Sequence, residues 1–207
     1  MIQETVIYDA DSKEAGALNI SKAEYVSIDN ISTSMKDAVI STEDKRFYDH
    51  KGFDPIGIIR AFAGLILHRG NIVGGGSTLT QQLAKNTFLT LDQTFLRKAK
   101  ELFLSFEIEK YYTKDQILEM YLNNAYFGNG AYGIENAAQR YFGKSAADLS
   151  ISESAILAGS LKAPSYYNPI DHYDATVKRR ATVLQLMVTN GKISEQDANI
   201  ASESDIV

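Results

Sequence analysis

Cysteine is absent from this chain of 207 residues, and proline occurs only three times. Without cysteine the chain can form neither a disulfide bond nor a thiolate metal site, although an oxidising compartment is still permitted. Its three histidines, His50, His68 and His172, are too scattered for metal-ligand spacing. The residues alone therefore define no metal site.

Positive charge and long hydrophobic runs are also scarce. The net charge is −5 and the pI is near 5.3, which argues against a nucleic-acid partner held by overall basicity. Residues 1–20 lack the basic start and apolar run of a signal peptide. The longest apolar run, IGIIRAFAGLIL at residues 56–67, contains Arg60 and is shorter than the roughly 20 residues that span a bilayer. It is either a buried core helix or a segment lying in a membrane interface.

The remaining sequence predicts one mostly α domain after an extended lead-in. Residues 1–30 mix polar residues with short apolar alternation (TVIYDA, EYVSID), typical of a linker or a short strand. Helical patterns dominate residues 31–207, where we expect an all-α domain of about eight to ten helices. Helix starts are indicated by N-cap side chains with a polar partner three residues on: Thr78 with Gln81, Thr113 with Gln116, Ser150 with Glu153, and Ser194 with Asp197. Helix ends are indicated by Gly143, Pro164 and Gly191.

The stretch STEDKRFYDHKG at residues 41–52 contains the first candidate site. If a helix continues from Met35, then Val39, Glu43 and Phe47 lie four residues apart on one face. A carboxylate on an apolar face loses hydration, which disfavours its charged form and suits proton transfer. Taken alone, however, the Glu43–Asp44 pair is equally explained as solvated surface or a helix cap.

The stretch GGGSTLTQQLAKN at residues 74–86 is the second. Three glycines lead directly into a helix start, where free backbone N–H groups favour an anion such as phosphate. Lys85, four residues after Gln81, adds a positive charge. The order of residues excludes a nucleotide P-loop, because Ser77 and Thr78 follow the glycines without a preceding lysine. A flexible hinge before a capped helix is the alternative.

The stretch RKAKELFLSFEIEK at residues 97–110 is the third. Glu101 follows Arg97 by four residues and Lys98 by three, so the three charges can cluster on one helix face. Such a cluster could lie beside a pyrophosphate, but surface ion pairs of this kind are common. Helix packing is the default explanation for the aromatic-rich and small-residue-rich segments at residues 121–143 and 152–169.

Together these segments resemble the glycosyltransferase family 51 domain of class A penicillin-binding proteins and monofunctional transglycosylases. EDKRFYDHKGFD, GGSTLTQQLAKN, RKAKE, YLNNAYFGNGAYGIENAA and SESAILAGSLKAPSYYNP with KRRATVLQLM resemble the five family motifs in order. The resemblance implies a lysozyme-like multi-helix fold with a membrane-facing mobile segment between the first two motifs. It assigns residues 31–207 to a glycosyltransferase domain.

The resemblance also implies the reaction, in which lipid II is polymerised into glycan strands with release of undecaprenyl pyrophosphate. Glu43 matches the family's general base and Glu101 its second glutamate. The residues expected to bind substrate are Asp44, Phe47, Arg60, Ser77, Gln81, Gln82, Lys85 and Arg97. Family members often have a basic residue where this chain has Gln93. A divalent cation, usually Mg²⁺ in this family, could compensate for that difference.

The expected partners are lipid II, the growing glycan strand and a membrane surface contacted through residues 53–70, with no nucleic acid. The sequence shows no transmembrane helix and no SxxK motif, so we expect an isolated domain of a longer protein, which could carry a transpeptidase. Its expected place is the outer face of the cytoplasmic membrane. The alternatives are a lysozyme-like glycan hydrolase and a catalytically silent lipid II-binding module.

Overall fold

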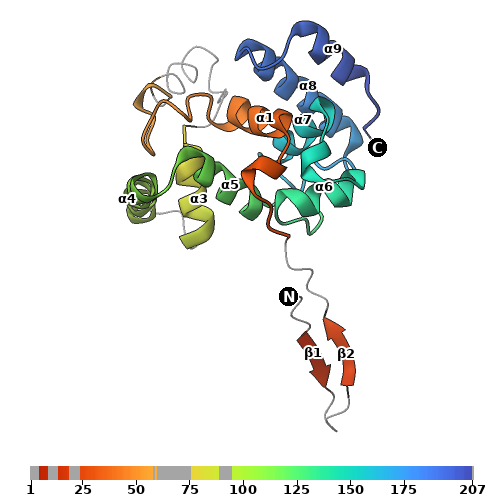
Figure 1. Cartoon of the computed structure of the whole chain (residues 1–207), viewed down its shortest axis with the longest axis horizontal. Coiled ribbons are helices and arrows are strands. Elements are labelled where there is room, and N and C mark those ends of the chain that lie inside the picture. Colours follow the sequence, from red (N-terminus) through yellow and green to blue (C-terminus); the bar gives the residue numbers. More distant parts are fainter. Residues whose placement is uncertain are drawn as a thin grey trace.

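The computed structural model describes residues 5–8, 14–18, 24–57, 59, 76–88 and 95–206. This part of the chain is mostly helical, as predicted (Figure 1). Its α-helices are α1 (Thr33–Glu43), α3 (Leu79–Phe88), α4 (Phe95–Tyr111), α5 (Lys114–Asn124), α6 (Ile134–Phe142), α7 (Ile151–Ser160), α8 (Tyr173–Thr189) and α9 (Glu195–Glu203). Two short 3-10 helices are η1 (Ile28–Asn30) and η2 (Ala146–Asp148).

The lead-in contains more structure than a linker. Strands β1 (Thr5–Tyr8) and β2 (Glu14–Leu18) pair antiparallel, with an irregularity between Ile7 and Tyr8. The apolar alternation in TVIYDA therefore corresponds to a strand. The alternation in EYVSID does not, because its last residues enter η1. Residues 24–30 already belong to the helical body, since the backbone N–H and C=O of Val26 both bond the side chain of Asn123 on α5.

The helix boundaries follow the predicted caps. At the starts of α5, α7 and α9, the N-cap side chain and its partner bond each other's backbone N–H groups. The same reciprocal pair joins Thr78 and Gln81 before α3, at 3.1 Å in both directions. Gly143 ends α6 in the left-handed conformation, where a side chain would be strained. These boundaries are encoded by residues three or four positions apart.

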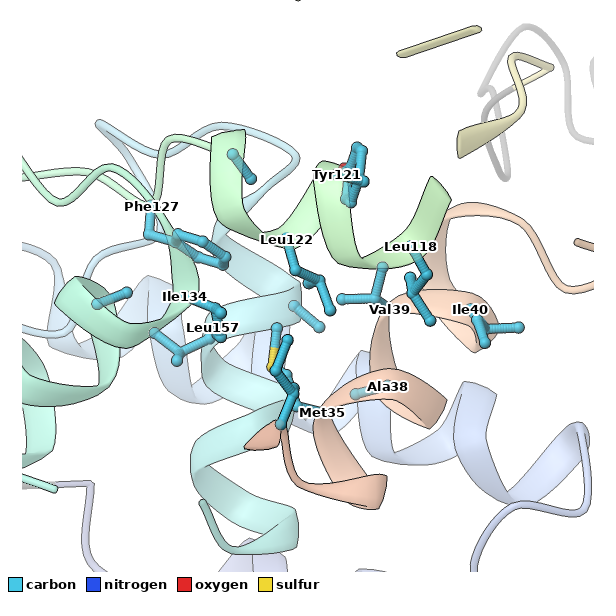
Figure 2. Packing of buried hydrophobic residues seen from close by; sticks show 14 of the residues in the cluster. Met35, Ala38, Val39, Ile40, Leu118, Tyr121, Leu122, Phe127, Ile134 and Leu157 are labelled. Carbon is cyan, nitrogen blue, oxygen red and sulfur yellow. The ribbon is translucent and has the colours of Figure 1, made fainter. Parts of the chain in front are cut away.

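Helix α7 lies at the centre of the packing against α1, α8 and α9. Nearly every residue of ISESAILAGS is buried, because neighbouring helices cover this one on several sides. On the other side of the body, α3 packs against α4 and α5. Figure 2 shows the core between these groups, where Met35 and Val39 of α1 lie near Leu122 of α5 and Leu157 of α7.

The predicted helix face of Val39, Glu43 and Phe47 is only half correct. Val39 is fully buried and Glu43 follows it as the last residue of α1. Phe47, however, lies in the turns at residues 45–49 rather than on the helix. The helix ends because Asp44 adopts a non-helical backbone conformation (φ −156°, ψ 74°), and the Asp44 side chain is used in contacts beyond the helix.

Candidate active site

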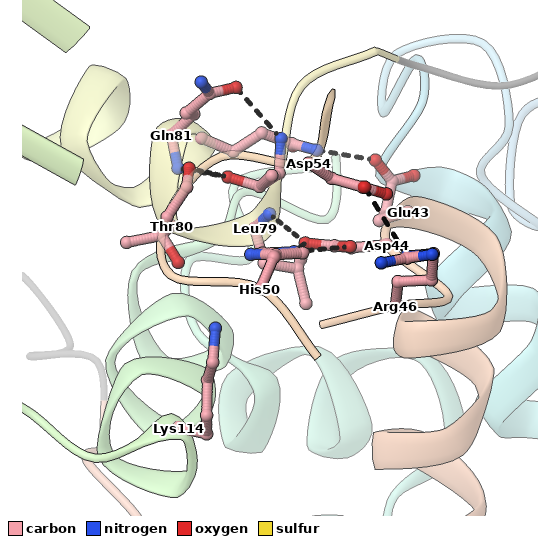
Figure 3. Close-up of polar contacts among 12 residues, drawn as sticks. Glu43, Asp44, Arg46, His50, Asp54, Leu79, Thr80, Gln81 and Lys114 are labelled. Atoms are coloured by element: carbon pink, nitrogen blue, oxygen red, sulfur yellow. Dashed lines mark hydrogen bonds and ion pairs between the residues drawn. The ribbon is translucent and has the colours of Figure 1, made fainter. Parts of the chain in front are cut away.

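Asp44 joins the end of α1 to the start of α3. Its carboxylate accepts a 3.0 Å bond from the backbone N–H of Leu79, the first residue of α3. Both carboxylate oxygens also lie 3.0 Å from Nε2 of the buried His50. The negative charge therefore meets the positive end of the α3 dipole. Figure 3 shows this junction, with Glu43 beside it at the end of α1.

Glu43 is held by a side chain of α3. The amide of Gln82 donates a 2.8 Å bond to Oε2 of Glu43. The phenol of Tyr121, on α5, donates a 3.2 Å bond to the carbonyl oxygen of the same amide. Burial and, to a smaller degree, the charge of Glu43 hold the pKa of Tyr121 well above its usual value, so Tyr121 keeps its proton and remains a donor. The two successive hydrogen bonds from Tyr121 to Gln82 and from Gln82 to Glu43 thus fix the orientation of a half-buried carboxylate.

Arg179 of α8 lies close enough to Glu43 for their charges to interact. Burial, the larger effect, lowers the pKa of Arg179, and the negative charge of Glu43 raises it. The side chain is placed by its Nε–H, which donates a 3.3 Å bond to the Gly159 carbonyl, and by the ring of Tyr167 at 5.7 Å. One carboxylate oxygen of Glu43 is bound by Gln82, and the charge of Arg179 lies nearby.

Glu101 forms a second, deeper centre on α4. Its side chain is only 2% exposed, which excludes the surface ion pair that the spacing alone allowed. Lys98 is bonded to Oε1 of Glu101, and Arg97 lies 3.8 Å from Oε2. The Lys98 ammonium also donates a 3.0 Å bond to the hydroxyl of Ser77, just before α3. The predicted cluster of three charges is confirmed, and it adjoins the start of α3.

Several residues predicted to bind substrate have contacts within the protein. Phe47 is fully buried with the Lys114 ammonium 4.5 Å from its ring centre. Gln81 is 2% exposed, because its side-chain carbonyl caps the start of α3. Asp44 is likewise buried at the helix junction. Direct contact of these three side chains with a substrate stays a prediction.

Lys85 is exposed on α3, and its ammonium has no partner among the described residues. Gln81 lies four residues before it on the same helix, as the spacing predicted, but Gln81 is buried while Lys85 is exposed. Arg60, Gln93, Gly74, Gly75 and most of residues 53–70 lie outside the described residues. Their predicted roles therefore stay predictions.

The described part of the chain brings together no group of three or more His, Asp or Glu side chains that could hold a metal ion. The expectation of Mg²⁺ therefore rests on the family resemblance. Within the same residues, no helix is long and apolar enough to cross a membrane.

Three side chains of this site were missed by reasoning from the sequence: Lys98, Tyr121 and Arg179. Lys98 was counted as a charge near Glu101 but not as a link to Ser77. Tyr121 lies in YLNNAYFG, a segment for which packing was the default explanation, and Arg179 lies in KRRATVLQLM, which was considered only as part of the fifth family motif. The available signal was KRR at residues 178–180, because three consecutive cations on a helix that packs against α7 cannot all point to solvent.

A family model described as Transglycosylase matches residues 11–188. Penicillin-binding protein 2a of Streptococcus pneumoniae is 49% identical over 202 residues, covering 98% of this chain and 27% of that protein. Penicillin-binding protein 1A of Escherichia coli is 47% identical over 190 residues, covering 92% and 22%. The crystal structure of penicillin-binding protein 1A from Haemophilus influenzae matches with a TM-score of 0.57 and 26% identity, over 100% of this chain and 21% of that one. The chain thus spans about a quarter of the length of these relatives.

Proposed function

Because this chain belongs to the transglycosylase family of peptidoglycan glycosyltransferases, we propose that it polymerises lipid II into glycan strands with release of undecaprenyl pyrophosphate. In the proposed step, the 4-hydroxyl oxygen of an acceptor sugar attacks the anomeric carbon of the growing chain. The bond from that carbon to pyrophosphate breaks on the opposite face, and the hydroxyl proton passes to Glu43. The configuration at the anomeric carbon is inverted, as in inverting glycosidases, with the acceptor hydroxyl in place of water.

Glu43 suits the role of general base because its carboxylate is held in position and still has one oxygen available to accept a proton. Gln82 occupies Oε2, and Oε1 accepts no bond from the described residues. A base must lie within hydrogen-bond reach of the proton it removes. The Gln82 contact orients Glu43 so that Oε1 can face the acceptor hydroxyl.

The cations around Glu101 suit the leaving group. Negative charge develops on the pyrophosphate as its bond to the sugar breaks, and fixed cations stabilise such charge most effectively where water is excluded. Arg97 and Lys98 are held by the buried Glu101, and Ser77 connects Lys98 to the start of α3. Lys85 extends from the same helix into solvent. We assign the pyrophosphate to this side of α3.

The observation that carries the proposal is the position of α3 between the two acidic centres. Its Gln82 binds Glu43 on one side, and the residue before its N-cap, Ser77, binds the Lys98–Glu101 pair. A base for the acceptor and cations for the leaving group are therefore placed by one helix, as a displacement reaction requires.

The decisive experiment measures polymerisation of labelled lipid II in detergent, with products sized on a gel. We expect long products from the wild type and none from Glu43→Gln, which keeps the side-chain shape but cannot accept the proton. Glu203→Gln, at the exposed end of α9, is the matched control and should polymerise normally. Circular dichroism of each variant separates a lost base from a lost fold.

Three results would contradict the proposal. Degradation of polymeric peptidoglycan without consumption of lipid II would indicate a lysozyme-like hydrolase. Polymerisation by Glu43→Gln at the wild-type rate would remove Glu43 as the base. Binding of lipid II without turnover by any variant, wild type included, would indicate a silent binding module.

The setting of the reaction follows from the substrate. Lipid II is displayed at the outer face of the cytoplasmic membrane, and we propose that this domain acts there, contacting the membrane through residues 53–70. Because the chain spans about a quarter of its relatives' length, we also propose that the parent protein has further domains, a transpeptidase among them.

A further inference from the structure

Helix α8 carries two consecutive arginines that bond the ends of two other helices. Nε of Arg179 donates to the carbonyl of Gly159, in the last turn of α7, at 3.3 Å. The two terminal nitrogens of Arg180 donate to the carbonyls of Ser202 and Ser204, at the end of α9, at 2.6 and 2.7 Å. Carbonyls at a helix C-terminus lack partners within the helix and carry partial negative charge. Neither α7 nor α9 has a basic residue in its own last turn, so α8 supplies both cations.

Arg180 is the more deeply buried of the two and is only 4% exposed. Besides the two carbonyls of α9, its guanidinium donates a 2.9 Å bond to the hydroxyl of Ser152, in the first turn of α7. Its hydrogen-bond partners among the described residues are thus uncharged oxygens of two helices. A buried charge is costly unless its donors are satisfied. The guanidinium of Arg180 therefore specifies one position of α8 relative to both α7 and α9.

The two arginines bond α7 at points that lie far apart. Ser152 and Gly159 are close to opposite ends of this helix, about 10 Å apart along its axis at 1.5 Å per residue. The adjacent side chains of Arg179 and Arg180 therefore extend toward opposite ends of α7. Gly159 permits a close approach, because a Cβ at its position would lie 2.9 Å from Cγ of Arg179. One contact would let α8 pivot on α7, whereas two separated contacts hold it in one register.

The register of α8 bears on the candidate active site. Helix α8 also packs against α1, whose last residue is Glu43. The side-chain amide of Asn190, just after α8, donates a 3.3 Å bond to the carbonyl of Ser41 near the end of α1. The charges of Arg179 and Glu43 interact. A shift of α8 along α7 would therefore change the position of Arg179 relative to the carboxylate.

We propose that Arg180 is a positioning residue for the glycosyl transfer: by binding α8 to the start of α7 and the end of α9, it holds Arg179 where its charge interacts with Glu43. The inference rests on the proposed function for the role of Glu43. Arg180 is buried and acts through Arg179. Helix α9 lies beyond residues 11–188, which the family model matches, and by this inference it belongs to the catalytic unit.

Steady-state polymerisation of lipid II by Arg180→Gln is the first test. We expect kcat to fall about tenfold, since a displacement of about 1 Å can cost that much or more, while KM stays unchanged. Arg179→Gln should lower kcat as well. Because Arg180 acts through Arg179, the double variant should lose little more than Arg179→Gln alone. Arg140→Gln, which removes an exposed arginine of α6, is the matched control and should have normal kinetics.

The pH–rate profile separates this role from a merely structural one. Glu43 interacts with the titratable groups of Arg179 from α8 and Tyr121 from α5, and α3 contributes the uncharged Gln82. Tyr121 keeps its proton, so the charge comes from Arg179. A nearby positive charge favours the ionised form of a carboxylate. If Arg180→Gln displaces Arg179, the acid limb of the profile should move to higher pH, as in Arg179→Gln. A general loss of stability would lower the rate without moving the limb.

A third measurement needs no turnover. Because the chain has no cysteine, a pair of spin labels can be placed at Thr33→Cys on α1 and Gln185→Cys on α8, which are both exposed positions. Double electron–electron resonance then measures the distance between the two helices. We expect Arg180→Gln to shift or broaden this distance distribution, and Arg180→Lys, which can still bond a carbonyl of α9, to give an intermediate result. The pair at Thr33→Cys and Asn124→Cys, on α5, should be unchanged.

The proposal is overturned if the label distances in Arg180→Gln match the wild type, if its acid limb does not move, or if its loss of kcat multiplies with that of Arg179→Gln. Should Arg180→Gln fail to fold, Ser152→Ala, which removes only the bond to α7, decides by the same criteria with smaller expected changes. The distance measurement is independent of the polymerisation assay. A wild type that does not polymerise lipid II, with label distances changed by Arg180→Gln, would count against the proposed function alone.

Discussion

The amide of Gln82 donates a 2.8 Å hydrogen bond to Glu43, 39 residues earlier in the chain. The bond connects the last residue of α1 to the second turn of α3. It is the most direct constraint on the carboxylate proposed as the base, because Glu43 stands at a helix end where the backbone changes direction at Asp44.

Removing the Gln82 amide should therefore impair catalysis more than stability. For Gln82→Ala we expect kcat to fall about 10- to 100-fold, since a base displaced by about 1 Å loses that much, with a similar melting temperature. Steady-state polymerisation of lipid II measures the change. Gln185→Ala, at an exposed position of α8, should have normal kinetics. Normal kcat in Gln82→Ala would mean that the bond does not place the base.

Tyr121 should act through Gln82. Tyr121→Phe removes the hydroxyl that holds the Gln82 carbonyl, and we expect kcat to fall by less than in Gln82→Ala, about 3- to 10-fold. Residues that share one network have non-additive effects. In the Gln82→Ala background, Tyr121→Phe should therefore add little further loss. Independent, multiplying effects in this double-mutant cycle would disprove the linkage.

Asp44 should be important for stability. Asp44→Ala leaves the first N–H of α3 and the buried His50 without their carboxylate. We expect the free energy of unfolding to fall by about 2–3 kcal/mol, the cost of unpaired buried polar groups, in urea denaturation. Asp49→Ala, in the same turn but exposed, should change it by less than about 0.5 kcal/mol. Equal effects of both substitutions would contradict the role of the junction.

Gly52 should tolerate no side chain. Its φ of +81° favours glycine, and a Cβ would lie 2.8 Å from the Ser105 carbonyl oxygen on α4. Gly130 has a similar φ of +76° but open space around it. We expect Gly130→Ala to cost about 1 kcal/mol from backbone strain, and Gly52→Ala to cost about 2 kcal/mol more from the clash. Chemical denaturation of the pair measures the difference. Indistinguishable values would show that α4 moves to make room.

Glu153 should contribute to the acid sensitivity of the fold. Burial raises its pKa, but hydrogen bonds from Lys144 and Ser150 outweigh burial, so the pKa lies below the usual 4.5. A lowered folded pKa stabilises the protein above the unfolded value, and the contribution is lost as the pH falls below about 4.5 toward the folded value. Glu153→Gln should lose less stability than the wild type between pH 6 and pH 3, measured by thermal unfolding. The effect is small because the side chain is partly solvated, and Glu203→Gln should follow the wild type.

The mostly helical, lysozyme-like fold predicted from the sequence is supported by the structural likeness to the penicillin-binding protein of Haemophilus influenzae. The capping pairs predicted the helix starts correctly. Ser150 and Glu153, or Thr113 and Gln116, are three residues apart and meet within one helical turn independently of the tertiary structure. Glu101 was placed beside Arg97 and Lys98 for the same reason. The strand pair β1–β2 was anticipated only in part, since pairing depends on a partner strand.

Predictions failed where distant segments compete for a residue. A continuous helix through Phe47 was reasonable on spacing alone, but the Asp44 carboxylate is drawn to Leu79, 35 residues away, and the helix stops. Gln81 was expected to bind an anion beside Lys85; its side-chain carbonyl caps its own helix, and contact with a substrate stays a prediction. The burial of Glu101 could not be seen, because spacing shows neighbours on one helix and not what covers them.

By itself, the sequence determined the helical character, the helix ends and the local charge cluster on α4, because these depend on interactions between residues three or four positions apart. Only the tertiary structure decided that Gln82 binds Glu43, that the charges of Arg179 and Glu43 interact, and that one side of α4 is buried while the other is exposed. Those relationships join segments separated by tens to more than a hundred residues. They exist only once α1, α3 and α8 have packed around the core. There a polar group that has lost its hydration is costly unless it has a partner, so each buried polar contact favours one arrangement.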